Sequence, residues 1–158
     1  MKKTCVLVLE NIRSVENTAS IFRTADGFGV SKIILIGTTP SPLDRFGRER
    51  RDFIKISLGA EKVVDWEYVR AQDLRFKIQD LREQSFKIIA LEQHPKSVKL
   101  VLDTKPLEPF VLIVGNEVDG ISQEALKLSD SILEIPMQGK KESLNVSVAT
   151  GIALFVLS

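Results

Sequence analysis

Residues 111–122 read VLIVGNEVDGIS, and the expected fold depends on the change of character within them. An apolar run of strand length leads into a polar turn bounded by Gly115 and Gly120, and a helix start follows at Ser122. Ligands bind at the carboxyl ends of strands in open α/β sheets, where glycine lets them approach the backbone. The turn lacks the glycine spacing of a dinucleotide fingerprint and the Gly-Lys-Ser/Thr of a phosphate loop. A binding turn is therefore predicted, with a plain tight turn as the alternative.

Similar apolar runs recur along the chain, separated by segments of helical character. Continuous rather than alternating runs are typical of strands covered on both faces, as in a parallel sheet. This order predicts an α/β fold with a mainly parallel sheet flanked by helices. The expected strands are 4–9, 32–36, 87–91, 110–114 and 131–135. The expected helices are 14–28, 71–85 and 144–157, with a short one from Ser122, and the expected loops are 38–47, 94–109 and 136–143.

The composition is that of one soluble globular domain. A length of 158 residues suits a single domain. Apolar residues make up 44% of the chain and charged residues 27%, which excludes the disordered class. There are 22 Lys and Arg against 21 Asp and Glu, so the formal charge is only +1. Any signal for nucleic acid or a membrane must therefore be local.

The chain has one cysteine, Cys5, and one histidine, His94. They exclude an internal disulfide and are too few for a structural zinc site. No apolar stretch approaches the roughly 20 residues that span a bilayer, and the N-terminal residues resemble no signal peptide. A cytoplasmic protein without a metal or membrane association is expected. Cys5 lies in an apolar run and is expected in the core.

Polar residues interrupt the apolar stripe of the helix expected at 14–28. Ser14 is a suitable N-cap, and the stripe follows at residues 15, 18, 19, 22 and 25. Asn17 and Arg23 are six residues apart, which is about 240° around the axis, so they do not share a face. Taken without other evidence, polar residues at these positions indicate a solvated helix face.

Residues 135–147, IPMQGKKESLNVS, form a second candidate binding loop. A strand end, a proline and a glycine are followed by Ser143-Leu144-Asn145 at the start of an apolar helix. Such a helix start offers free backbone N–H groups to a ligand. The alternative is that Ser143 only caps the helix.

Residues 44–55, DRFGRERRDFIK, concentrate positive charge around two aromatic rings. Arginines position the phosphates of a nucleic acid, and phenylalanine stacks on unpaired bases. Asp44, Glu49 and Asp52 are interleaved, so an ion-paired solvated surface explains the segment equally well. The cations are Arg45, Arg48, Arg50, Arg51 and Lys55.

Three segments together resemble the motifs of the SpoU family of RNA ribose methyltransferases, in the SPOUT superfamily. They are NTASIFRTADGFG (17–29), IVGNEVDGIS (113–122) and IPMQGKKESLNVSVATGIAL (135–154). Each is weak alone, but the three in this order are highly specific. The resemblance is to the catalytic domain of that superfamily, and many relatives carry an extra RNA-binding domain. Residues 1–158 are expected to form a single catalytic domain without one, because the first expected strand follows the N-terminus directly. The resemblance also implies a C-terminal deep trefoil knot, which general connection rules disfavour.

The resemblance further implies that S-adenosylmethionine binds in the knot, mainly to the backbone of three loops, and that a homodimer interface completes the active site. The three loops follow expected strands, where a ligand crevice is expected. Apolar side chains among them suit the adenine ring. The implied donor-binding residues are Leu91, Glu92, Gly115, Asn116, Ile135, Met137 and Leu144.

The implied reaction is methyl transfer to a ribose 2′-hydroxyl without a metal. The resemblance implies that Arg23 activates this hydroxyl, either as a general base or by binding phosphate and polarising the developing oxyanion. The second role is favoured, because a guanidinium is almost always protonated. Asn17 is expected to hold Arg23 or the substrate, and Glu117 to orient the arginine or the ribose. Ser143 and Asn145 are expected to join the donor site to the hydroxyl.

The second motif departs from the family at Val118-Asp119, where many members have a further glycine. A β-branched residue disfavours positive φ, so a slightly different turn is expected.

The expected substrate is tRNA, because no appended domain helps the chain to engage ribosomal RNA; rRNA is the alternative. Residues 45–55 and the partner's Arg23 region are the expected RNA contacts. A catalytically silent RNA-binding protein of the same fold is a second hypothesis. A hydrolytic small-molecule enzyme is a third, although no Gly-x-Ser-x-Gly elbow is present.

Overall fold

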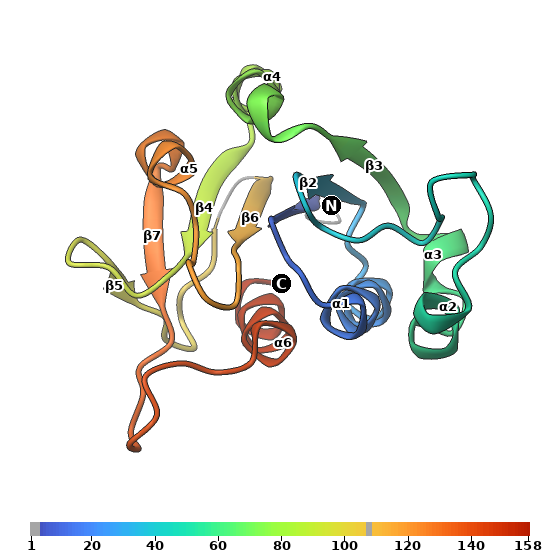
Figure 1. The fold of residues 1–158 in the computed structure, drawn as a ribbon. Coiled ribbons are helices and arrows are strands. Elements are labelled where there is room, and N and C mark those ends of the chain that lie inside the picture. The colour runs from blue at the N-terminus through green and yellow to red at the C-terminus, as the bar shows by residue number, and fades with distance from the viewer. Residues whose placement is uncertain (1–3, 107–108) are drawn as a thin grey trace.

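The computed structural model describes residues 4–106 and 109–158, which form one sheet of seven parallel strands (Figure 1). The strand order is β3-β2-β1-β6-β4-β7-β5. The strands are β1 (Cys5–Glu10), β2 (Lys32–Ile36), β3 (Asp65–Val69), β4 (Lys87–Leu91), β5 (Val98–Lys99), β6 (Phe110–Val114) and β7 (Ser131–Glu134). The predicted parallel α/β fold is confirmed.

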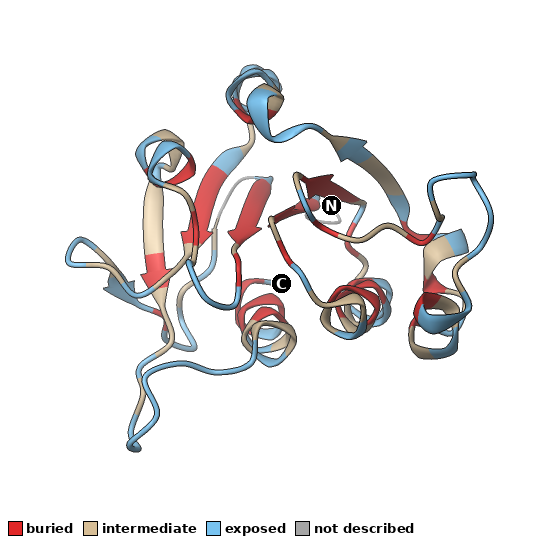
Figure 2. Cartoon of the chain, in the orientation of Figure 1, coloured by how far each residue is buried: buried red, intermediate tan, exposed pale blue. Residues whose placement is uncertain are grey.

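Helices cover both faces of the sheet (Figure 1). They are α1 (Val15–Gly27), α2 (Arg51–Ser57), α3 (Ala60–Val63), α4 (Leu74–Glu83), α5 (Gln123–Leu128) and α6 (Val146–Leu157), with a 3₁₀ turn η1 (Ala71–Asp73). One face packs against α1, α2 and α6, and the other against α4 and α5. Every residue of β1 and β6 is therefore buried, which explains their continuous apolar sequences (Figure 2).

The expected helices are present with small shifts at their ends. Ser14 caps α1 as predicted, because its Oγ accepts a hydrogen bond from the Asn17 N–H at 3.0 Å. The expected helix at 71–85 begins as the 3₁₀ turn η1, and its apolar stripe, Leu74, Ile78 and Leu81, is buried. Helix α6 begins at Val146, two residues later than predicted.

Strands β3 and β5 and helices α2 and α3 were not predicted. Strand β3 reads DWEYV and lies at an edge with no buried residue, so it lacks the continuous apolar run of the inner strands. The prediction of a loop throughout 94–109 is wrong at Val98–Lys99, where β5 pairs with β7 through two residues. Helix α2 is held by Phe53, which packs edge-on against Phe22 at a centroid distance of 5.2 Å.

Cys5 is free and buried, as predicted. Burial raises the pKa of its thiol to about 12, so the thiol stays protonated at neutral pH. Among the helices of residues 4–106 and 109–158, none combines the length and apolar character that a bilayer span requires.

Candidate functional site

A cleft of about 430 Å³ opens where β4, β6 and β7 end, and the start of α6 borders it. Carboxyl ends of parallel strands meet at one edge of a sheet, which brings loops distant in sequence together. Ten of the twelve residues predicted to act in catalysis or donor binding line this cleft. They are Leu91, Glu92, Gly115, Asn116, Glu117, Ile135, Met137, Ser143, Leu144 and Asn145.

The turn after β6 is a narrow loop, and both of its end positions require glycine. Asn116 and Gly120 exchange backbone hydrogen bonds of 3.2 and 2.9 Å. A Cβ on Gly115 would lie 2.5 Å from the carbonyl carbon of Gly120, closer than real Cβ atoms approach. Gly120 itself has φ +71°, a left-handed conformation that glycine adopts without strain. Val118 is not among the residues with positive φ, so the departure from the family pattern introduces no strain there.

The side chain of Asn116 shapes the same turn from inside. Its Oδ1 accepts hydrogen bonds from the N–H groups of Val118 at 2.7 Å and Asp119 at 2.9 Å. Its Nδ2 donates to the backbone oxygen of Asn11 at 2.8 Å, which ties the turn to the end of β1. Asn116 is 8% exposed, so its polar atoms are committed to this structure.

Two carboxylates hold the far side of the turn. Glu92, after β4, accepts hydrogen bonds from the N–H groups of Ile121 at 2.8 Å and Gln93 at 3.2 Å. Glu10, at the end of β1, is 3% exposed and accepts from Ser122 N at 2.8 Å and Ser122 Oγ at 2.6 Å. The role of Glu10 in the site was not predicted. The signal for it in the sequence is an acidic residue at the end of an apolar strand.

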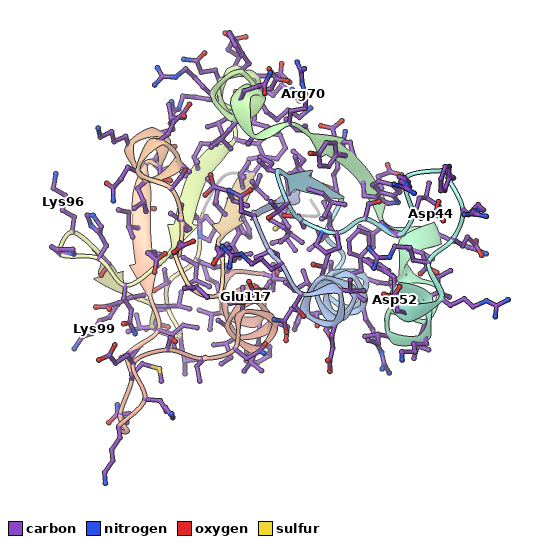
Figure 3. All side chains as sticks on the ribbon, in the orientation of Figure 1. Asp44, Asp52, Arg70, Lys96, Lys99 and Glu117 are labelled. Atoms are coloured by element: carbon purple, nitrogen blue, oxygen red, sulfur yellow. The ribbon has the colours of Figure 1, made fainter. Side chains whose placement is uncertain are left out.

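A chain of side-chain hydrogen bonds joins α1, the turn and α6. Asn17 Nδ2 donates to Glu117 Oε1 at 3.2 Å, and Asn145 Nδ2 donates to Asn17 Oδ1 at 3.1 Å. Glu117 is labelled in Figure 3, at the centre of the molecule. Each of the three residues comes from a different one of the three sequence motifs, which supports their action as one site.

Glu117 is ionised in this arrangement. Partial burial raises the pKa of its carboxyl, but hydrogen bonds from its own N–H, the Asn17 side chain and the Arg13 N–H outweigh that effect and lower the pKa overall. The Arg13 N–H lies 3.3 Å from Glu117 Oε2. The site therefore presents a carboxylate at the mouth of the cleft.

Arg23 is exposed on α1 and does not line the cleft. The hydrogen bonds of Asn17 go to Glu117 and Asn145, so the expected contact of Asn17 or Glu117 with Arg23 is not formed within the described part of one chain. The alternative in which Ser143 caps the last helix is wrong. Asn145 is the N-cap, accepting from Ser147 N at 2.9 Å.

The basic segment lies on the other side of α1 from the cleft; in Figure 3, Asp44 and Asp52 mark it. Two of its arginines form ion pairs, Arg48 with Asp44 at 3.2 Å and Arg50 with Asp52 at 2.8 Å. The other three predicted RNA contacts, Arg45, Arg51 and Lys55, form no ion pair with a described residue.

Comparison with known proteins gives consistent matches. The model of the SpoU rRNA Methylase family matches residues 4–155. The tRNA (guanosine(18)-2′-O)-methyltransferase of Aquifex aeolicus is 30% identical over 155 residues, covering 98% of this chain and 68% of that protein. The 23S rRNA (guanosine-2′-O-)-methyltransferase of Vibrio parahaemolyticus is 31% identical over 150 residues, covering 95% and 57%.

A solved structure, the AdoMet-bound rRNA methyltransferase from Sinorhizobium meliloti, matches with a TM-score of 0.77 and 28% identity. It aligns with 98% of this chain and 55% of that one. The chain spans about half the length of the first curated relatives it matches.

The Gly115→Ala variant should be destabilised by about 1–3 kcal/mol, because the added methyl group meets backbone atoms that cannot move aside freely. Urea unfolding measures the loss. Gly139→Ala is the matched control, since a Cβ there meets nothing within 4 Å and should change the free energy of unfolding by less than about 0.5 kcal/mol. Equal stabilities for the two variants would contradict the steric argument.

Glu117 should stabilise the fold in a pH-dependent way. Because its pKa is lower in the folded chain than its usual 4.5, its contribution is complete above pH 4.5 and is lost as the pH falls through the folded-state value. The stability difference between wild type and Glu117→Gln should therefore be constant near neutral pH and shrink in acid. Urea unfolding at about pH 7 and about pH 3.5 tests this, and an unchanged difference would refute it.

Proposed function

The chain belongs to the SpoU rRNA methylase family, and we propose that it transfers a methyl group from S-adenosylmethionine to a ribose 2′-hydroxyl of RNA. The observation that carries this proposal is the meeting of the three motifs at one cleft, through the hydrogen bonds of Asn17, Glu117 and Asn145. Relatives named as tRNA and rRNA 2′-O-methyltransferases support the reaction.

The cleft fits the methyl donor in both shape and chemistry. Leu91, Ile135, Met137 and Leu144 provide an apolar wall suited to a purine ring. The backbone at Gly115 carries no side chain, so a ligand can approach the strand end closely. The Sinorhizobium relative, 28% identical, is described as AdoMet-bound. When bound, the donor supplies a methyl group on a sulfonium, a leaving group that needs no metal.

The protein's tasks are then alignment and stabilisation of the developing oxyanion. In the transfer, the bond from methyl carbon to sulfur breaks, with its electron pair remaining on the sulfur of S-adenosylhomocysteine, as the bond to the ribose oxygen forms, and the hydroxyl proton passes to water. Arg23 binds the adjacent phosphate and polarises the oxyanion. Asn17 and Glu117 align the acceptor ribose, and Ser143 and Asn145 connect the two substrates.

The proposal includes a homodimer in which the partner's copy of α1 reaches the cleft. An exposed apolar face that no described element covers consists of Phe28, directly after α1, and of Val148, Ile152 and Phe155 on α6. Phe28 and Phe155 lie 6.4 Å apart there, and Phe155 is 68% exposed. A contiguous exposed apolar face is typical of a protein interface. Arg23 projects from α1 outside its own cleft, so a second subunit can use it.

The trefoil knot is likewise a proposal. Strand β7 lies between β4 and β5, although β5 follows β4 directly in the chain. The end of α6, at Leu157, shares a cavity with Thr104, Lys105 and Pro106 of the β5–β6 connection. Both features fit a C-terminal segment that passes through the loop between β4 and β6.

We propose tRNA as the substrate, with rRNA as the alternative, and a cytoplasmic location with residues 1–158 as one catalytic domain. RNA contacts are assigned to the five cations at 45–55. Arg45, Arg51 and Lys55 support this assignment best, because no described carboxylate pairs with them. When RNA binds, its phosphates would replace the carboxylate partners of Arg48 and Arg50 or would contact these arginines alongside them.

Labelled methyl transfer from S-adenosylmethionine to unfractionated tRNA and to rRNA tests the proposed reaction. Wild type should label a 2′-O-methyl nucleotide in one RNA class. Arg23→Ala and Arg23→Lys should each lose at least about 100-fold in rate, as expected for loss of an oxyanion-stabilising group. Both should retain donor affinity in calorimetry, because Arg23 does not line the cleft of its own chain and its proposed contacts are with the RNA.

Arg75→Ala is the control, since Arg75 is an exposed arginine of α4 on the opposite face of the sheet. A chain that binds RNA but not the donor would instead be the silent RNA-binding protein. Donor binding without affinity for tRNA or rRNA would contradict RNA methylation.

The dimer is tested by sedimentation of Phe155→Asp. A charge at the centre of the exposed apolar face should convert a dimeric wild type to a monomer and abolish methyl transfer. Phe76→Asp, at a comparably exposed phenylalanine on α4, should leave the dimer intact. A monomeric wild type that is fully active would refute the interface.

A further inference from the structure

A short hairpin carries an aromatic ring that the chain neither buries nor uses in its core. Residues 43–49, here named the Phe46 hairpin, close with a bridge between Leu43 and Glu49. Phe46 is 65% exposed and is absent from both hydrophobic clusters of the described residues. A ring held in water at the tip of a polar loop contributes little to folding, and it is accessible to another molecule.

Two arginines lie over this ring. The guanidinium carbon of Arg45 is 4.8 Å from the ring centroid of Phe46, and that of Arg48 is 5.0 Å from it. Planar cations over a ring are favoured by cation–π attraction. Together the three side chains offer flat surfaces and positive charge at one place.

The hairpin is rigid enough to present these groups in a fixed arrangement. Asp44 Oδ1 accepts hydrogen bonds from the N–H groups of Phe46 at 2.8 Å and Arg48 at 3.0 Å, and its Oδ2 accepts from Arg48 Nε at 3.2 Å. Gly47 supplies the positive φ of the turn. The hydrogen bond from the Arg48 backbone is the main reason that the pKa of Asp44 lies below its usual value, so these contacts persist at neutral pH.

We propose that the Phe46 hairpin binds an unpaired nucleobase of the RNA substrate, which stacks on Phe46 and the guanidinium planes of Arg45 and Arg48. The inference rests on the proposed function, because it takes RNA as the substrate. A nucleotide matches the site in both respects, since its base stacks on aromatic rings and guanidinium planes and its phosphate pairs with cations. Residues 44–55 carry five cations against three carboxylates, whereas the whole chain is nearly neutral.

A protein partner fits this hairpin less well. An apolar docking site gains its energy from burying neighbouring apolar groups, but guanidinium groups surround the Phe46 ring. The hairpin also lies across α1 from Glu117 of the same chain (Figure 3), so the base it holds does not belong to the nucleotide that reacts in that chain's own cleft. It would thus select the RNA by an unpaired region near the target.

Binding of the full chain to unfractionated tRNA, and to a single-stranded RNA containing 2-aminopurine, tests this inference. Phe46→Ala should weaken both affinities by about 5- to 150-fold, the range for loss of one stacked base. It should also abolish the 2-aminopurine fluorescence change that stacking causes. Phe46→Trp should bind as wild type does, whereas Phe46→Leu, apolar but not aromatic, should bind like Phe46→Ala.

Salt dependence separates stacking from charge. Phe46→Ala should leave the slope of log affinity against log salt unchanged, because a phenylalanine releases no counterions. Arg45→Ala should reduce the slope by about one. Phe76→Ala is the matched control, since Phe76 is 69% exposed and no guanidinium of the described residues lies over its ring.

Full binding by Phe46→Ala or Phe46→Leu would overturn the inference. If wild type then still methylates RNA, the proposed function stands and the hairpin alone is misassigned, with a protein contact as its remaining use. If wild type binds neither RNA, both the inference and the proposed function are wrong.

Discussion

The site depends on the turn between Gly115 and Gly120, which is anchored to the ends of β1 and β4. Glu10, at the end of β1, accepts a hydrogen bond from the N–H of Ser122, and Glu92, after β4, accepts one from the N–H of Ile121. Asn116 ties the start of the turn to the chain after β1. These groups are largely buried. In the protein interior, a polar group left without its hydrogen bond costs about 1–3 kcal/mol. The position of Glu117 is therefore set by the sheet.

This anchoring explains how exposed polar residues can form a definite site. Glu117, Asn17 and Asn145 are linked near the surface, where single hydrogen bonds between side chains contribute little. Their backbones, however, belong to the turn, to α1 and to the N-cap of α6, each fixed by buried contacts. The cleft between these elements is thus held in shape by the core, and its own polar groups remain available to a ligand.

Most of this arrangement was predictable from the sequence, and the failures have two physical causes. Continuous apolar runs predicted the inner strands. The N-cap residue Ser14 and the apolar stripe that follows it predicted α1. Strand β3 and the two-residue β5 are at the edges, where burial is partial and no apolar run is required. Glu10 was missed because its partner, Ser122, is 112 residues away, and no local pattern reveals such a pairing.

The separation of the linked residues along the chain also constrains how the protein is made. Asn17 meets Asn145 across 128 residues, and α6 contributes the fully buried Ala153, Leu154 and Leu157 to the core. Contacts between residues this distant in sequence form late in folding, and proteins that depend on them fold slowly. During synthesis, the sheet face that α1 and α2 cover therefore lacks α6 until residues 146–157 emerge, and such uncovered apolar surface is where aggregation begins. The growing chain thus has no complete cleft until α6 packs against the sheet. Until then, the uncovered apolar surface is accessible to chaperones.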